Sequence, residues 1–258
     1  MIFADALLAR RLEAAEAANA RESNNQPGSA VLEARGGGCA IFAGAGSPLS
    51  HAVGIGLNGP VPDSQIVEIE TFFRSRGAKV TFDICPLADP ALVATLSDRG
   101  YRIAEFNNVL VKRLADTAVC SAQRARRAGL EESDLWSYTV GRGFFEQPEL
   151  TTEEMDVGRA IFHMQGAMCY FASTESGQLA AGAACAIRDG LATLFADTTV
   201  LDFRRTGLHR ELIAARLNDA LSQGCDLATA STLPGSGSQR NYERLGFQVV
   251  YTKVTMVG

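Results

Sequence analysis

Apolar residues recur along the chain at two spacings, and these spacings predict alternating helices and strands. A spacing of about 3.6 residues marks helices at residues 2–22, 63–76, 90–98, 131–145, 152–163, 208–223 and 236–244. Short apolar or alternating runs predict strands at residues 30–34, 39–43, 51–57, 79–85, 101–114, 167–173, 179–188, 191–198, 226–231 and 247–256. The mixture predicts an α/β (α+β) fold with mixed, mainly antiparallel sheets flanked by helices.

The element order of the first half recurs in the second half. Arg99-Gly100-Tyr101-Arg102-Ile103 resembles Leu245-Gly246-Phe247-Gln248-Val249, and the two glycines are 146 residues apart. Gly77 and Gly224, 147 residues apart, each stand before a predicted strand. A shared order with a stable offset predicts a tandem duplication.

Composition and charge narrow the class of protein. The 258 residues are 47% hydrophobic with a mean hydropathy of +0.03, which is typical of a soluble globular chain. The net charge of −5 argues against nucleic acid as a partner, because phosphate binding needs clustered Lys and Arg. The N-terminal segment lacks a cleavage site, and no run approaches about 18 apolar residues. We therefore expect a cytoplasmic protein without a membrane partner.

The spacing of cysteines and histidines predicts neither disulfides nor a metal site. The six cysteines form no C-x-x-C pair and mostly lie in apolar runs, so they are expected to be reduced core residues: Cys39, Cys85, Cys120, Cys169, Cys185 and Cys225. The three histidines, His51, His163 and His209, lack the spacing of zinc ligands.

A glycine turn with two arginines stands where a strand runs into an amphipathic helix. Its residues are Arg204, Arg205, Thr206, Gly207, Leu208 and His209. Helix N-termini offer unpaired N–H groups and a positive dipole end, and arginine adds bidentate donors, so this arrangement is typical of anion binding. An ordinary glycine turn with solvated arginines is the alternative.

A second motif lies 35 residues after Gly207, with one predicted strand between: Tyr242-Glu243-Arg244-Leu245-Gly246-Phe247. Together the two motifs resemble the GNAT superfamily, which has R/Q-x-x-G-x-G/A at the start of its central helix and then Y-x-x-x-G-F. The resemblance covers about residues 117–256. It implies an acetyl-CoA-dependent N-acetyltransferase without a metal.

The resemblance also assigns roles to residues. It implies that residues 204–209 hold the CoA phosphates, and that the pantetheine arm enters between strands 191–198 and 226–231, against backbone groups near Asp197 and Thr199. An N–H there would stabilise the oxyanion that forms when an amine attacks. Tyr242 would act as general acid toward the CoA thiolate. The alternative for Tyr242 is a packed aromatic residue.

Two positions depart from the family pattern. His209 stands where Gly or Ala is usual, and Gly235 replaces an asparagine that contacts the cofactor in many members. Ser236 or Ser238 is expected to supply that contact instead. Asp197 is the first candidate for general base; water is its rival, and Asp197 could equally cap the following loop.

The sequence does not identify the acceptor amine. His163, Tyr170 and Glu146 are candidates for lining its pocket, although each could equally be structural. The amine could belong to a small molecule or to a protein lysine or N-terminus. A non-catalytic acyl-CoA sensor is a further alternative, and both a monomer and a homodimer are compatible with the sequence.

The N-terminal half lacks this chemistry. Where the arginine and glycine loop would lie it has Leu57-Asn58-Gly59-Pro60-Val61-Pro62, and prolines remove N–H donors. Leu96 stands at the position that corresponds to Tyr242. We expect a degenerate GNAT-like domain over residues 1–115 and an acetyl-CoA-binding domain over residues 116–258.

Overall fold

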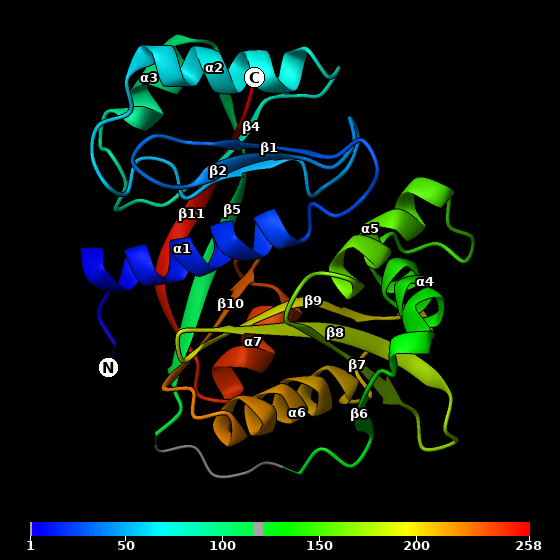
Figure 1. The fold of residues 1–258 in the computed structure, drawn as a ribbon. Helices are drawn as coiled ribbons and strands as arrows, with labels where there is room; N and C mark the ends of the chain where they lie inside the picture. The colour runs from blue at the N-terminus through cyan, green and yellow to red at the C-terminus, as the bar shows by residue number, and fades with distance from the viewer. Residues whose placement is uncertain (1, 116–120) are drawn as a thin grey trace. The chain divides into compact units, whose positions relative to one another are not determined.

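The computed structural model describes residues 2–115 and 121–258, which form two compact units (Figure 1). Unit 1 contains Met1–Val109, Thr232–Pro234 and Val249–Gly258. Unit 2 contains Leu110–Ser231 and Gly235–Gln248. The predicted boundary segment, residues 115–130, includes five positions outside the described residues, among them Cys120.

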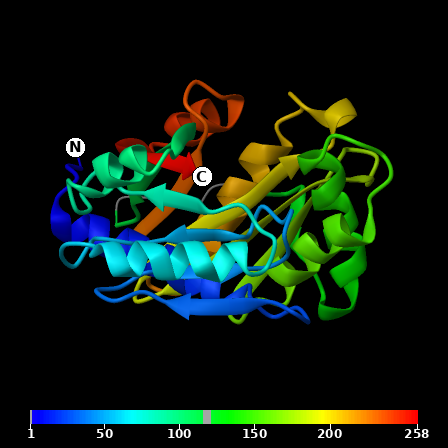
Figure 2. The ribbon, with the colours of Figure 1, turned by 90° about the horizontal axis from the view of Figure 1, so that it is seen from above.

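Unit 1 is a sheet with strand order β1-β2-β3-β4-β11-β5. Its elements are α1(Ala6–Glu22), β1(Ala30–Glu33), β2(Cys39–Phe42), β3(His51–Val53), α2(Asp63–Arg74), β4(Thr81–Ile84), α3(Leu92–Asp98), β5(Arg102–Arg113) and β11(Gln248–Val257). Ala17 of α1 packs on Cys39, Ile41 and Val53. Both ribbon views place α2 on the face of β1 and β2 away from α1 (Figure 2).

Unit 2 is a sheet with strand order β5-β10-β9-β8-β7-β6. Its elements are β6(Ala125–Arg127), α4(Ser133–Phe144), α5(Thr152–Phe162), β7(Ala167–Ser173), β8(Leu179–Arg188), β9(Leu191–Thr199), α6(Leu208–Ser222), β10(Leu227–Thr232) and α7(Gly237–Arg244), with 3-10 turns at Leu130–Glu132 and Leu201–Phe203. The sheet is mixed, because β9 and β10 are parallel while β6 to β9 are antiparallel. The fold-class prediction is confirmed.

One of the two central strands of unit 2, β8, is built from small residues because it is covered on both faces. Its residues from Ala180 to Ala186 are buried, and α4 and α6 both contact this strand. At Gly182 a Cβ atom would lie 2.6 Å from Val140 of α4. Tyr170 and Ala172 of β7 belong to the core that includes α6, whereas Phe171 belongs to the core that includes α4. The short side chains of β8 therefore let helices pack closely on each face.

The duplication predicted from the sequence is present in the order of elements. The series α2, β4, α3, β5 corresponds to α6, β10, α7, β11. Gly100 and Gly246 both end a short helix in the left-handed conformation, at φ of 89° and 87°. The last strand of each repeat nevertheless lies partly in the other unit: most of β11 lies in unit 1, and the end of β5 lies in unit 2. Val249–Gly258 belongs to unit 1, where β11 pairs with β4, and β5 from Leu110 onward belongs to unit 2.

The structure differs from the sequence prediction in two strands. β6, at Ala125–Arg127, was not predicted, because three residues are too few to show an alternation of apolar and polar positions. It pairs with β7. The strand expected at residues 51–57 ends at Val53, since Gly54 and Gly56 take positive φ and turn the chain.

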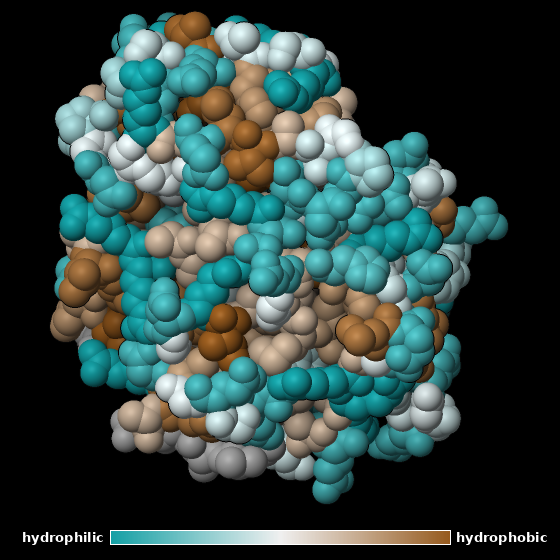
Figure 3. Space-filling view, viewed as in Figure 1, coloured by the Kyte–Doolittle hydropathy of each residue, from teal (hydrophilic) through white to brown (hydrophobic). Residues whose placement is uncertain are grey.

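Five cysteines are buried and form no disulfide within the described part of the chain: Cys39, Cys85, Cys169, Cys185 and Cys225. Hydrophilic residues cover most of the face seen in Figure 3, where strongly hydrophobic residues form small separate groups. Among residues 2–115 and 121–258, no helix combines the length and the apolar character needed to span a bilayer.

Candidate functional site

The candidate site of unit 2 begins where β9 leaves β10. The two strands pair in parallel from Leu191 opposite Leu227 to Leu194 opposite Ala230, and the ladder ends there. β9 has an irregular register with β8 at this point, and Ala196 adopts a φ of 55°, which is unusual for a residue with a side chain. Within the described residues, no strand therefore pairs with β9 after Leu194 on the side that faced β10.

The loop after β9 ends in a helix N-terminus that no side chain caps. Gly207 is the N-cap of α6, with a φ of 87°, and its carbonyl oxygen accepts from the backbone nitrogens of Arg210 and Glu211. Arg205 also has positive φ, at 66°; its side chain is exposed and makes no hydrogen bond or ion pair with the described residues. An exposed guanidinium beside an open helix start is an arrangement that commonly binds anions in proteins.

Arg204, the other arginine of the loop, is engaged within the protein. Its Nη2 lies 2.8 Å from Oε1 of Glu146 and 3.1 Å from the carbonyl oxygen of Gly143. Its Nε donates to the carbonyl of Thr199 at 3.2 Å. Thr206 donates its hydroxyl to the carbonyl of Phe203 at 2.6 Å. Arg204 and Thr206 therefore shape the loop, while Arg205 faces solvent.

Asp197, at the bend of β9, accepts hydrogen bonds from three side chains. Tyr242 donates to Oδ2 at 2.8 Å, and His209 Nε2 lies 3.1 Å from Oδ1. Arg216 of α6 donates to both oxygens. Asn241 Nδ2 lies 3.1 Å from His209 Nδ1. Because an amide nitrogen only donates, Nδ1 accepts, and Nε2 carries the hydrogen that it donates to Asp197.

Burial and charge fix the protonation of this cluster. Burial alone would raise the pKa of Asp197, but the Arg216 charge and the His209 hydrogen bond outweigh it and hold the pKa well below its usual value. Burial, then the Asp197 charge, raises the pKa of Tyr242 well above 10. Asp197 is thus an ionised acceptor with its oxygens engaged, and Tyr242 keeps its proton.

The structure brings some of the predicted site residues together and separates others. Thr199, Gly207 and His209 line the unpaired end of β9 and the start of α6, while the side chain of Leu208 is buried in the core. Ser236 caps α7 by accepting from the backbone nitrogen of Gln239 at 3.1 Å. The hydroxyl of Ser238 makes no hydrogen bond with the described residues.

The three candidate acceptor residues each have a different partner. Glu146 pairs with Arg204, His163 lies 2.9 Å from the Ser133 hydroxyl, and Tyr170 donates to Asp219 on α6 at 2.5 Å. Tyr170 is buried in the core with α6. The structure therefore does not gather these residues into one pocket.

Sequence reasoning missed Arg216, which is fully buried. It follows His209, Leu212 and Ile213 at helical spacing, so it occupies a position where the apolar face of α6 requires a hydrophobic side chain. A charged residue at such a position needs a buried partner. That requirement is the signal that could have pointed to the pair with Asp197.

The fold of this chain is shared with known proteins of solved structure. No protein-family model matches the chain, and no curated protein matches it in sequence. A GCN5-related N-acetyltransferase from Kribbella flavida is similar in structure over 95% of both chains, with 20% identity and a TM-score of 0.67. A tandem GNAT protein from the clavulanic acid biosynthesis pathway is similar over 96% of this chain and 93% of its own, with 16% identity and a TM-score of 0.62. This chain has the tandem GNAT fold. A GCN5-related N-acetyltransferase from Sphaerobacter thermophilus shares it over 89% of this chain and 75% of that one, with 15% identity and a TM-score of 0.58.

Within this tandem GNAT fold, the loop before α2 in unit 1 corresponds to the loop before α6 in unit 2 but has different hydrogen-bonding groups. Helix α2 follows Pro62, which offers no side-chain cap. The Val61 N–H just before it already donates to Oδ2 of Asp89 at 2.9 Å. Leu96, the counterpart of Tyr242, is buried. A carboxylate therefore occupies the surroundings that an anion would need in unit 1.

Proposed function

We propose that unit 2 binds acetyl-CoA and transfers its acetyl group to an amine. The observation that carries this proposal is the direct succession of an unpaired strand end and an open helix start, from Leu194 of β9 to Gly207. An extended chain of amides can pair with the free edge of β9 while phosphates reach the helix N-terminus. The tandem GNAT fold supports the same assignment.

The residues of the loop fit the phosphates of such a co-substrate. The N–H groups at the start of α6 and the exposed Arg205 guanidinium would bind them, and Gly207 lets the backbone approach closely. The His209 side chain turns toward Asp197 and Asn241, which leaves its backbone N–H available. Ser238, whose hydroxyl has no hydrogen-bond partner among the described residues, is the better of the two serines for the contact that Gly235 cannot make.

The chain also offers a proton donor near the bend of β9. Acetyl-CoA supplies a thioester, and attack by an amine forms a C–N bond while the C–S bond breaks. Tyr242 would protonate the departing thiolate by turning its O–H from Asp197 Oδ2, to which it donates in the structure, toward the sulfur. A carboxylate with a depressed pKa is a weak base, so water is the better candidate for taking the proton of the acceptor ammonium.

The test is release of free thiol from acetyl-CoA in the presence of an amine library that includes small amines and lysine peptides. We expect amine-dependent release that saturates in acetyl-CoA and is weakened in the Arg205→Ala variant. An acetylated product confirmed by mass identifies the acceptor class. Absence of both acetyl-CoA binding and thiol release would reject the proposal.

A non-catalytic acyl-CoA sensor is the second candidate, and one observation favours it. Tyr242 is 1% exposed and its hydroxyl is already bonded to Asp197, as in a packing residue. A sensor would bind acetyl-CoA with wild-type residues and release no thiol with any amine. The same assay therefore separates the two functions.

A further inference from the structure

The loop between β3 and α2 contains the pair Asn58-Gly59, in which an asparagine stands directly before a glycine. No other asparagine of the sequence is followed by glycine. The backbone nitrogen that follows an asparagine can attack the carbon of the side-chain amide, and a side chain on the following residue hinders that attack. Glycine has no side chain, so this pair is the place in the chain where the attack is least hindered.

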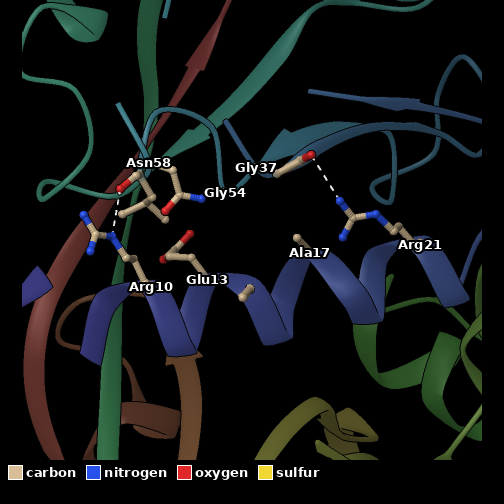
Figure 4. Close-up of a pocket in the computed structure, with 10 residues that line it drawn as sticks. Arg10, Glu13, Ala17, Arg21, Gly37, Gly54 and Asn58 are labelled. Carbon is tan, nitrogen blue, oxygen red and sulfur yellow. Dashed lines mark hydrogen bonds between the residues drawn. The ribbon is translucent and has the colours of Figure 1, made fainter. Parts of the chain in front are cut away.

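Water reaches both residues of the pair. Asn58 and Gly59 are exposed, and a Cβ atom built on Gly59 would meet no atom within 4 Å. Asn58 also lines a cavity of about 280 Å³ beside α1, where its side chain is drawn with those of Arg10 and Glu13 (Figure 4). The amide carbon and the attacking nitrogen are therefore both open to solvent.

Hydrogen bonds do not protect the pair. Among the described residues, the N–H of Gly59 donates no hydrogen bond and the side-chain amide of Asn58 makes none. Asn19 and Asn218 lie instead inside α1 and α6, where the N–H of the next residue belongs to the hydrogen-bonded helix. The nitrogen of Gly59 is thus free to react, whereas the corresponding nitrogens in the helices are held.

The backbone at Gly59 can also change its conformation. Its φ is 134°, and glycine moves between regions of φ and ψ that hinder other residues. The similar pair Asp189-Gly190 is more constrained, because the turn is closed by the ladder of β8 and β9. The loop at Asn58 has no such ladder across it, so closing a five-membered ring between the two residues requires only local movement.

We propose that Asn58 is a site of deamidation through a cyclic succinimide. Hydroxide removes the proton of the Gly59 nitrogen, which attacks Cγ of Asn58. A C–N bond forms, the bond from Cγ to Nδ2 breaks, and the leaving nitrogen takes a proton from water, so ammonia departs and hydroxide is restored. Water then opens the ring at Cγ, which gives aspartate, or at the backbone carbonyl carbon, which gives isoaspartate.

The reaction places a new carboxylate near a guanidinium of α1. Arg10 donates Nε to the carbonyl oxygen of Leu57, the residue before Asn58, at 3.1 Å. Its terminal nitrogens make no hydrogen bond within residues 2–115 and 121–258. The modified chain therefore carries one more negative charge on the cavity wall, in unit 1, beside a cation that has no ion-pair partner in the described structure.

Peptide mapping of the full chain after incubation at mildly alkaline pH tests the proposal. Trypsin releases residues 36–74, in which Asn58 is the only asparagine, and residues 22–35, which contain the exposed Asn25 followed by Gln26. The first peptide should gain the mass difference between an amide and an acid at least tenfold faster than the second, as separable aspartate and isoaspartate forms. Equal rates in the two peptides, or no gain in residues 36–74, would overturn the proposal.

Variants and a free peptide separate the loop from the rest of the chain. Asn58→Gln, which would have to close a larger ring, should abolish the gain in residues 36–74, whereas the matched control Asn25→Gln should keep it. The folded chain should react no more than tenfold more slowly than a synthetic peptide of residues 36–74. A slower reaction would show that the fold protects Asn58 and would reject the site. Neither experiment uses acetyl-CoA, so the outcome is independent of the function proposed for unit 2.

Discussion

The hydroxyl of Tyr242, on α7, donates a 2.8 Å hydrogen bond to Oδ2 of Asp197 at the bend of β9. Arg216 and His209 donate to the same carboxylate, so Asp197 stays ionised and accepts from all three. The hydroxyl is thereby held beside the unpaired end of β9. Tyr242 therefore keeps its proton at neutral pH with the O–H directed at Asp197, and donation to a thiolate requires the O–H to turn away from that carboxylate.

Tyr242→Phe removes this hydroxyl and keeps the ring. We expect kcat to fall by about 10²-fold, the lower end of general acid catalysis, because a thiolate is a good leaving group. KM for acetyl-CoA should hardly change, and the loss should be greatest at high pH, where solvent supplies fewer protons. Steady-state thiol release across the pH range measures this.

The control for this variant is Tyr251→Phe, which removes a buried hydroxyl from unit 1. Both variants should lose about 1.5 to 3 kcal/mol of unfolding free energy, the typical worth of one hydrogen bond to a charged group. Equal kcat in the two would show that Tyr242 is a packing residue.

Arg204 and Arg205 should respond differently to truncation. Arg205 has no partner in the described structure, so Arg205→Ala should weaken acetyl-CoA binding by about 1.5 to 3 kcal/mol and leave the melting temperature unchanged. Arg204→Ala loses bonds to Glu146 and two carbonyls, so it should lower the melting temperature. Calorimetry and thermal unfolding on the pair check this; an unchanged Kd in Arg205→Ala would refute the phosphate assignment.

The depressed pKa of Asp197 predicts a specific loss of stability in acid. Its pKa is lower in the folded than in the unfolded chain, where it is about 3.9, so its contribution is present above that pH and is lost as the pH falls further. In urea unfolding, the free energy of unfolding of Asp197→Asn should therefore fall less steeply than that of the parent as the pH is lowered. At neutral pH it should be about 3 to 5 kcal/mol less stable, since Arg216 is left buried without its charge partner.

Lys253 of β11 lies between Glu13 and Glu16 of α1, at 3.1 and 2.8 Å, and is buried. Lys253→Met leaves two carboxylates without their cation and should cost about 3 to 5 kcal/mol of unfolding free energy. Lys79→Met, at an exposed position of the same unit, should change it by less than about 0.5 kcal/mol. Similar values for the two variants would show that the buried charges do not hold β11 in unit 1.

Local patterns predicted the elements well where a period runs for several turns. The helix predicted at residues 208–223 is α6, Leu208–Ser222, and Asp189-Gly190 forms the tight turn before β9, with both residues at positive φ. The glycine pairs that revealed the duplication recur at equivalent helix ends. These features depend on neighbours in the sequence, so the sequence alone contains them.

Features that depend on distant partners escaped the sequence analysis. The residue pattern of β11 predicts a strand but does not name β4 as its neighbour, so its place in unit 1 could not be foreseen. The network around Asp197 joins β9, α6 and α7, and only the three-dimensional fold shows that Arg216 engages the carboxylate. For this reason the sequence proposed Asp197 as a base, whereas its surroundings favour an orienting role.

Titration of the chain with acetyl-CoA by calorimetry tests the central claim most directly, with two glycine variants beside the parent. Gly207 and Gly224 stand at opposite ends of α6 with φ of 87° and 74°, so alanine should strain the backbone about equally at each. Only Gly207→Ala places a Cβ at the proposed phosphate site. We predict one acetyl-CoA per parent chain, the same in Gly224→Ala, and at least tenfold weaker binding in Gly207→Ala. A stoichiometry of two, or equal affinities in the two variants, would contradict the account.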